Sequence, residues 1–152
     1  MKTLQQWFDE YSLSHQNKTN QTIHFICVPA IFFSIVGMLM SIPNEFLQKT
    51  IGLNNPLIEN WATILLALIL VFYLRLSLTM FVKMFIFSVI CIVGNYYISI
   101  TFSLFYISLG IFILAWIGQF YGHHIEGKKP SFMKDLQFLL IGPAWVFEKL
   151  TK

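Results

Sequence analysis

Charged side chains are scarce in this sequence: they make up 11% of the 152 residues, about half the share that a soluble domain usually carries. The ten lysines and arginines outnumber the seven aspartates and glutamates by only three, and they are scattered along the chain. Binding to nucleic acid requires clustered basic residues, so no nucleic-acid partner is expected. Hydrophobic residues reach 57%, and they form long uncharged runs. This combination predicts a membrane protein.

Cysteine is also rare. The only two, Cys27 and Cys91, lie inside apolar runs. Two cysteines without an extracellular pattern do not indicate a disulfide framework, and they are interpreted as small buried side chains.

The apolar runs predict an all-α, polytopic membrane protein with a single membrane domain over residues 1–152. Four transmembrane helices are expected, over about 23–42, 61–82, 84–100 and 101–121. The boundary between the last two is poorly marked, because Asn95-Tyr96-Tyr97 fits either a turn or a helix end.

Two further segments are amphipathic or apolar but too short to cross a bilayer. Residues 3–12 predict an interfacial helix that Thr3 can cap, with one apolar face made of Leu4, Trp7, Phe8 and Tyr11. This helix would lie on the membrane surface or pack over the mouth of the bundle. Residues 132–150 are interrupted by Gly142-Pro143, and they predict a pair of re-entrant or interfacial helices.

Four spans would put both termini and the connection between spans two and three on one side of the membrane. Every lysine and arginine except Lys49 falls on that side, so the positive-inside rule places both termini in the cytoplasm. These residues also favour contact with anionic membrane lipid. The short chain without retention signals suggests a bacterial inner membrane, or the endoplasmic reticulum if the source is eukaryotic.

The same topology brings the four histidines to one membrane face. His15 and His24 flank the start of the first apolar run, and His123 and His124 end the last one. Imidazole is the commonest protein ligand of iron and zinc, so this face is a candidate metal site. On a helix, adjacent side chains point about 100° apart, so only one of His123 and His124 faces a given ion well. Alternatively, all four could bind lipid headgroups or cap helices.

Several polar residues could assist such a site. Asn17 and Asn20 lie between the first two histidines, and both can form directed hydrogen bonds. Gln119 lies one turn before His123, where it could bind a ligand or join two helices. Glu126 could be a metal ligand, orient a histidine ring, or pair with a lysine at the helix end.

Arg75 is the one charge well within a predicted span, close to its cytoplasmic end. It could extend its guanidinium to the membrane surface, or clamp a carboxylate near the histidines.

Two motifs carry a family resemblance. The first is His15-x-Asn17-x-x-Asn20-x-x-Ile23-His24 followed by Val28-Pro29. The second is Trp116-Ile117-x-Gln119-Phe120-x-Gly122-His123, then Glu126, a basic pair and Pro130, with Gly142-Pro143 and Glu148 further on. Together they extend over nearly the whole chain, which resembles the membrane-embedded 2-hydroxy fatty acid dioxygenases. These act late in the conversion of phytosphingosine, a sphingolipid base, to odd-chain fatty acids.

The resemblance implies an Fe(2+)-dependent dioxygenase that needs no 2-oxoglutarate. Its substrates would be a 2-hydroxy fatty acid and O₂, and it would release CO₂ and the acid one carbon shorter, an α-oxidation. The family pattern requires His15, His24 and His123 as ligands and leaves His124 as a neighbour. Asn17, Asn20, Gln119, Glu126 and Arg75 would then position ligands or substrate.

The main alternative is a non-catalytic lipid-binding or scaffold protein, whose polar motifs only shape the helix ends. The acyl chain length, the number of ions and the oligomeric state stay open, and a homo-oligomer is compatible with the sequence. Other histidine-metal lipid enzymes use more histidines than the four found here.

Overall fold

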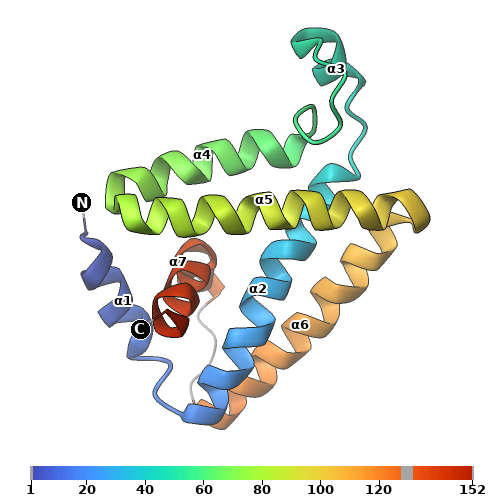
Figure 1. The fold of residues 1–152 in the computed structure, drawn as a ribbon. Coiled ribbons are helices and arrows are strands. Elements are labelled where there is room, and N and C mark those ends of the chain that lie inside the picture. Colours follow the sequence, from blue (N-terminus) through green and yellow to red (C-terminus); the bar gives the residue numbers. More distant parts are fainter. Residues whose placement is uncertain (1, 128–131, 152) are drawn as a thin grey trace. The chain divides into compact units, whose positions relative to one another are not determined.

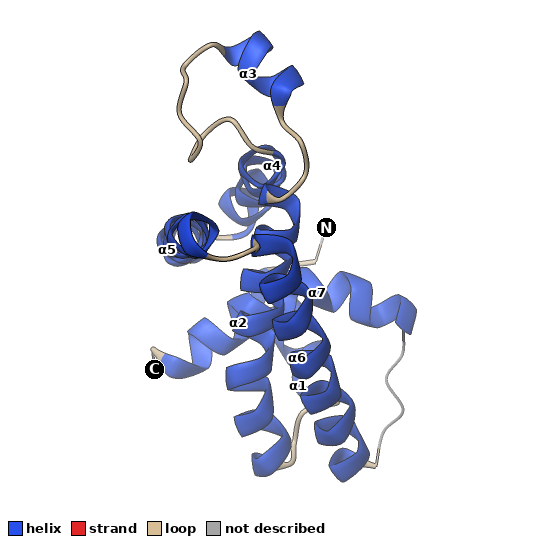
Figure 2. Cartoon of the chain, turned by 90° about the vertical axis from the view of Figure 1, so that its right-hand side faces the viewer, coloured by secondary structure: helices blue, strands red, loops and turns tan. Residues whose placement is uncertain are grey.

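A computed structural model describes residues 2–127 and 132–151, without the side chains of 132–139. The described residues form helices and no strand (Figure 2). The helices are α1 (Leu4–Ser12), α2 (Lys18–Met40), α3 (Glu45–Ile51), α4 (Trp61–Leu76), α5 (Leu78–Thr101), α6 (Leu104–Glu126) and α7 (Phe132–Leu150). The basic pair and Pro130 of the second motif lie outside the described residues.

The chain divides into two compact units. The first comprises Met1–Phe32 and Ile113–Lys152, and the second comprises Phe33–Phe112. Helices α2 and α6 therefore contribute a part of their length to each unit. All four histidines belong to the first unit.

Within the first unit, α1 packs against α7 (Figure 1). Helix α1 begins with the expected cap: Thr3 Oγ1 accepts from Gln6 N at 3.3 Å, and Gln6 Oε1 accepts from Thr3 N at 2.8 Å. Its apolar face buries Phe8 and Tyr11. Ser12, at its end, accepts a 2.9 Å hydrogen bond from Trp145 Nε1 of α7. Helix α1 therefore packs over α7.

The beginning of α2 and the end of α6 lie side by side, and two glycines make this approach close (Figures 1 and 2). A Cβ on Gly118 would lie 2.6 Å from Cys27 Sγ. A Cβ on Gly122, one turn later, would overlap Asn20 Oδ1. Glycines four residues apart are a common means of bringing two apolar helices together.

Helix α7 corrects one expectation. The sequence predicts two helices divided at Gly142-Pro143, but the structure has one helix that runs through Pro143. Residues on both sides of the pair are buried, including Ile141 and Trp145, so packing holds the helix together where one backbone hydrogen bond is lost. A Cβ on Gly142 would come 3.2 Å from Tyr11 Oη and 3.3 Å from Val28 Cγ1, so this position is also a tight contact.

In the second unit, α4 and α5 pack against each other and meet at Ser77 (Figure 1). The sequence predicts this break near Lys83, which instead lies inside α5. Ser77 is extended, with φ −168° and ψ 129°, and its Oγ accepts from Met80 N at 3.4 Å. Its hydroxyl therefore caps the new helix, and the break lies at Ser77 instead of near Lys83.

Among the described residues, three helices are long and apolar enough to cross a membrane: α2, α5 and α6. Helix α4 is apolar but has only 16 residues. Asn95, the possible turn residue, lies inside α5 and is fully buried, and its amide donates to the carbonyls of Cys91 and Phe33.

Candidate metal centre

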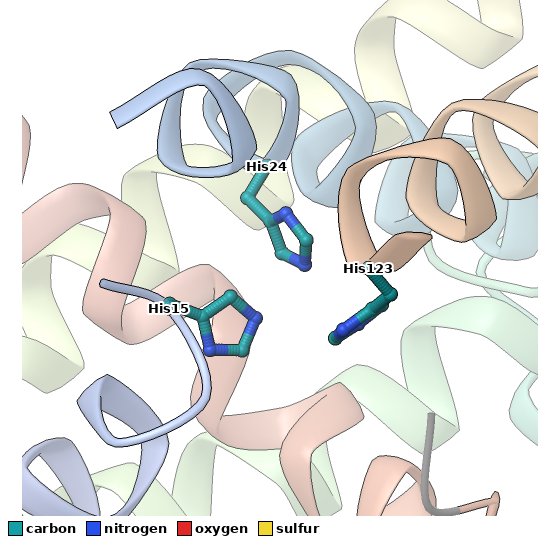
Figure 3. Close-up of side chains that lie close together, drawn as sticks. All are labelled: His15, His24 and His123. Atoms are coloured by element: carbon teal, nitrogen blue, oxygen red, sulfur yellow. The ribbon is translucent and has the colours of Figure 1, made fainter. Parts of the chain in front are cut away.

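Three histidines from separate segments meet inside the first unit (Figure 3). His15 follows α1, His24 lies in the second turn of α2, and His123 lies in the last turn of α6. Their exposed fractions are 3%, 1% and 8%. One ring nitrogen from each lies within 4.8 Å of the other two. Such a buried cluster of imidazoles is a candidate ligand set for one metal ion.

The rings face one another at steep angles, which suits convergence on a shared point. The centroids of His15 and His24 are 4.3 Å apart, those of His24 and His123 are 5.1 Å apart, and those of His15 and His123 are 5.4 Å apart. The interplanar angles are 76°, 86° and 66° in the same order. None of the three pairs is a flat stack. In a flat stack the nitrogen lone pairs lie in parallel planes and do not converge.

Backbone carbonyls set the tautomer of two of these rings. His15 Nδ1 lies 2.7 Å from Tyr11 O, and His24 Nδ1 lies 2.9 Å from Asn20 O. A carbonyl can only accept, so each Nδ1 carries the hydrogen and each Nε2 carries the lone pair. This is how protein metal sites orient neutral imidazole ligands, with the second ring nitrogen anchored to an acceptor.

Two aromatic side chains, Tyr11 and Trp145, pack against the ring of His15. The Tyr11 ring stacks on it with a centroid distance of 4.0 Å and an interplanar angle of 6°. Trp145 of α7, 1% exposed, packs against both rings at 5.1 Å from Tyr11 and 5.8 Å from His15. The sequence did not predict the contacts of Tyr11 and Trp145 with His15. The spacing of Tyr11, four residues before His15, was an available signal, whereas nothing in the sequence connects Trp145 to His15.

Glu126 fastens the His15 segment to α6. Its Oε1 accepts from Gln16 N at 2.9 Å, and its Oε2 accepts from Asn17 N at 2.9 Å and from Asn20 Nδ2 at 3.1 Å. Glu126 lies outside the three-histidine group. Both of its carboxylate oxygens accept hydrogen bonds from N–H donors of the segment that follows His15 and of α2.

The two predicted asparagines shape the start of α2. Asn17 Oδ1 accepts from the backbone nitrogens of Thr19 at 2.9 Å and Asn20 at 3.3 Å, as a helix N-cap does. Asn20 is fully buried between α2 and α6. A third amide, Gln21 Nε2, donates to His15 O at 2.7 Å. Together these bonds hold the segment that carries His15 against the helix that carries His24.

The other predicted site residues, Gln119, His124 and Arg75, differ in burial and in the unit to which they belong. Gln119 is 5% exposed and lies one turn before His123. His124 is exposed and does not belong to the three-histidine group. Arg75 is exposed in the last turn of α4, in the second unit.

The donor set fits a transition-metal ion. Three nitrogens bound to one ion at about 2.1 Å are about 3.4–3.6 Å from one another, so nitrogens that lie within 4.8 Å of one another reach this geometry if each moves inward by less than about 1 Å. Three imidazoles suit iron or zinc and leave coordination positions for other molecules. His15, His24 and His123 would hold the ion.

Fold and site together define a class: a protein whose described part is helical, has three helices long and apolar enough to cross a membrane, and buries a group of three histidines. The family comparison is more specific. Residues 1–152 match the family described as 2-hydroxy-palmitic acid dioxygenase Mpo1-like, and the chain belongs to this family. The resemblance carried by the two sequence motifs is thereby confirmed. No curated protein and no solved structure matches the chain.

Proposed function

We propose that this protein is an Fe(II)-dependent dioxygenase that cleaves 2-hydroxy fatty acids. The observation that carries the proposal is the buried group of His15, His24 and His123 in a chain that matches a dioxygenase family over its whole length. The reaction balances without a further reductant: R–CH(OH)–COOH and O₂ give R–COOH, CO₂ and H₂O. The hydroxyl-bearing carbon and the lost carboxyl carbon together supply the four electrons that O₂ accepts.

The three histidines would hold the ferrous ion, and the ion would supply the redox chemistry that allows O₂ to react with the hydroxy acid. Neutral imidazoles add no negative charge, so the positive charge of the site stays available to attract a substrate carboxylate. The Tyr11 and Asn20 carbonyls keep the His15 and His24 lone pairs on Nε2. Burial of all three rings excludes bulk water from the reacting atoms.

We assign the ligand part to His123 and not to His124, because only His123 is buried within the group. Asn17, Asn20 and Glu126 would hold the His15 segment in place, as their hydrogen bonds support. For Arg75, which belongs to the second unit, we propose the membrane-surface position expected of a charge at the end of an apolar helix.

The membrane setting follows from the same proposal. Helix α4, with 16 residues, would be the fourth span: it is about 24 Å long, and Arg75 in its last turn can extend to the surface of a locally thinned bilayer. Four crossings would leave both termini in the cytoplasm, as the distribution of basic residues predicts. The acyl tail of the substrate would remain in the apolar phase while its head group reaches the histidines.

The test is metal analysis and turnover of the purified protein in detergent. Wild-type protein loaded anaerobically with Fe(II) should retain one equivalent and convert 2-hydroxyhexadecanoic acid with O₂ to pentadecanoic acid and CO₂. His15→Ala, His24→Ala and His123→Ala should lose both iron and turnover, whereas His124→Ala, the matched control, should keep both. Wild-type protein that holds no iron and forms no product would instead support a non-catalytic lipid-binding protein.

A further inference from the structure

Gln119 presents a buried donor without a hydrogen-bond partner. The side chain is 5% exposed, and among the described residues nothing accepts from its Nε2. Native proteins pair nearly all buried amide groups, because an amide removed from water without a new partner is unfavourable. An unpaired buried donor beside a candidate active site is therefore explained if a bound molecule supplies the acceptor.

The position of Gln119 on α6 associates this donor with the histidines. Gln119 and His123 are four residues apart, so their side chains leave the same face of the helix with Cβ atoms about 5–6 Å apart. Gly118 and Gly122 directly precede Gln119 and His123 in the chain, and they lie on the adjacent face of α6, which contacts α2. Ala115, a further turn back on the same face as Gln119, is also buried, so this face is enclosed along three turns.

The direction along the helix adds a second argument. His123 lies in the last turn of α6, and Gln119 lies one turn further into the apolar part of the helix. A molecule whose acyl tail stays in the apolar phase while its head group reaches the histidines has that head group at this level. Gln119 is then beside the head group, between the histidines and the acyl chain.

We propose that Gln119 Nε2 donates a hydrogen bond to a carboxylate oxygen of the 2-hydroxy acid bound at the three histidines. The inference rests on the proposed function and adds a substrate-binding residue to it. A carboxylate bound to a cation through one oxygen keeps a second oxygen that can accept. Hydrogen bonds to a charged acceptor are stronger than those between neutral groups, so this contact would favour acids over the corresponding neutral lipids.

Cobalt(II)-loaded protein gives a readout other than turnover. Its visible spectrum reports the metal ligands, and a titration with 2-hydroxyhexadecanoate reports binding through a change in that spectrum. Gln119→Met removes the donor at nearly constant length. We expect an unchanged spectrum without substrate and a dissociation constant raised roughly tenfold or more. Gln5→Met is the matched control, since Gln5 is exposed on α1 and should alter neither.

A second variant keeps the test decisive if Gln119→Met does not fold. Gln119→Glu has the same shape but adds a negative charge, so it should weaken acid binding still further. An unchanged dissociation constant in a folded variant would overturn the assignment of Gln119 and leave the proposed function standing. A changed cobalt spectrum before substrate is added would also overturn it, because Gln119 would then act on the metal ligands. Wild-type protein that binds cobalt but not the acid would overturn both proposals.

Discussion

Replacing Glu126 by glutamine should weaken metal binding without removing a ligand. The carboxylate accepts N–H bonds from Gln16, Asn17 and Asn20. In Glu126→Gln, one oxygen becomes an NH₂ group that faces a backbone N–H, and the charge that strengthens all three bonds is lost. Hydrogen bonds to charged groups contribute about 1.5–3 kcal/mol each, and partial exposure of Glu126 places the expected loss near the lower figure, about 1.5 kcal/mol.

The weakened hydrogen bonds are those that hold the segment carrying His15, because Gln16 and Asn17 directly follow this histidine. A looser segment must be ordered again when the metal binds, so the affinity should fall by about tenfold to a hundredfold, as for other residues that orient metal ligands. The assay is competition for Fe(II) or Co(II) with a chelator of known affinity. Glu45→Gln, an exposed glutamate at the start of α3, is the control and should not change the affinity.

Two results would refute this reasoning in different ways. Equal affinity in Glu126→Gln and wild type would show that the hydrogen bonds do not position His15. A loss as complete as in His15→Ala, with an altered cobalt spectrum, would show that Glu126 is itself a ligand.

Two further changes test the packing around the site. Gly122→Ala should lower the free energy of unfolding by about 1–3 kcal/mol, because its Cβ would overlap Asn20 Oδ1. Gly110→Ala meets no atom within 4 Å and replaces a glycine inside a helix, so it should not lower the stability in thermal unfolding. A stable Gly122→Ala protein would argue against the close approach of α2 and α6. Tyr11→Leu should reduce metal affinity several-fold by removing the ring stacked on His15, and Tyr11→Phe should not; equal loss in both would assign the effect to the hydroxyl.

Local signals predicted most helices, and tertiary packing decided the exceptions. Thr3 and the apolar spacing of the first segment predict α1, which forms with the expected cap. The break at Ser77 was misplaced, because a serine inside an uncharged run looks unremarkable until its hydroxyl caps the next helix. The Gly142-Pro143 pair indicated a break, but burial on both sides kept α7 continuous.

For the site, the sequence could predict which residues carry suitable chemistry but not all of their partners. Topology and the two motifs pointed to His15, His24 and His123 meeting, and the structure brings these three together. His123 is buried and His124 is exposed because other parts of the chain enclose only one face of α6. Two adjacent histidines in a sequence do not indicate which face that is. The contact between Trp145 and His15 joins distant parts of the chain that share no pattern.

The separation of the three histidines along the chain has a consequence for biosynthesis. His15 and His24 leave the ribosome first, whereas His123 and Trp145, which packs against His15, are made much later. A partly synthesised chain therefore has two of the imidazoles but lacks the third and the enclosure. Under the proposed function, stable loading with iron would therefore wait until His123 and Trp145 have been made.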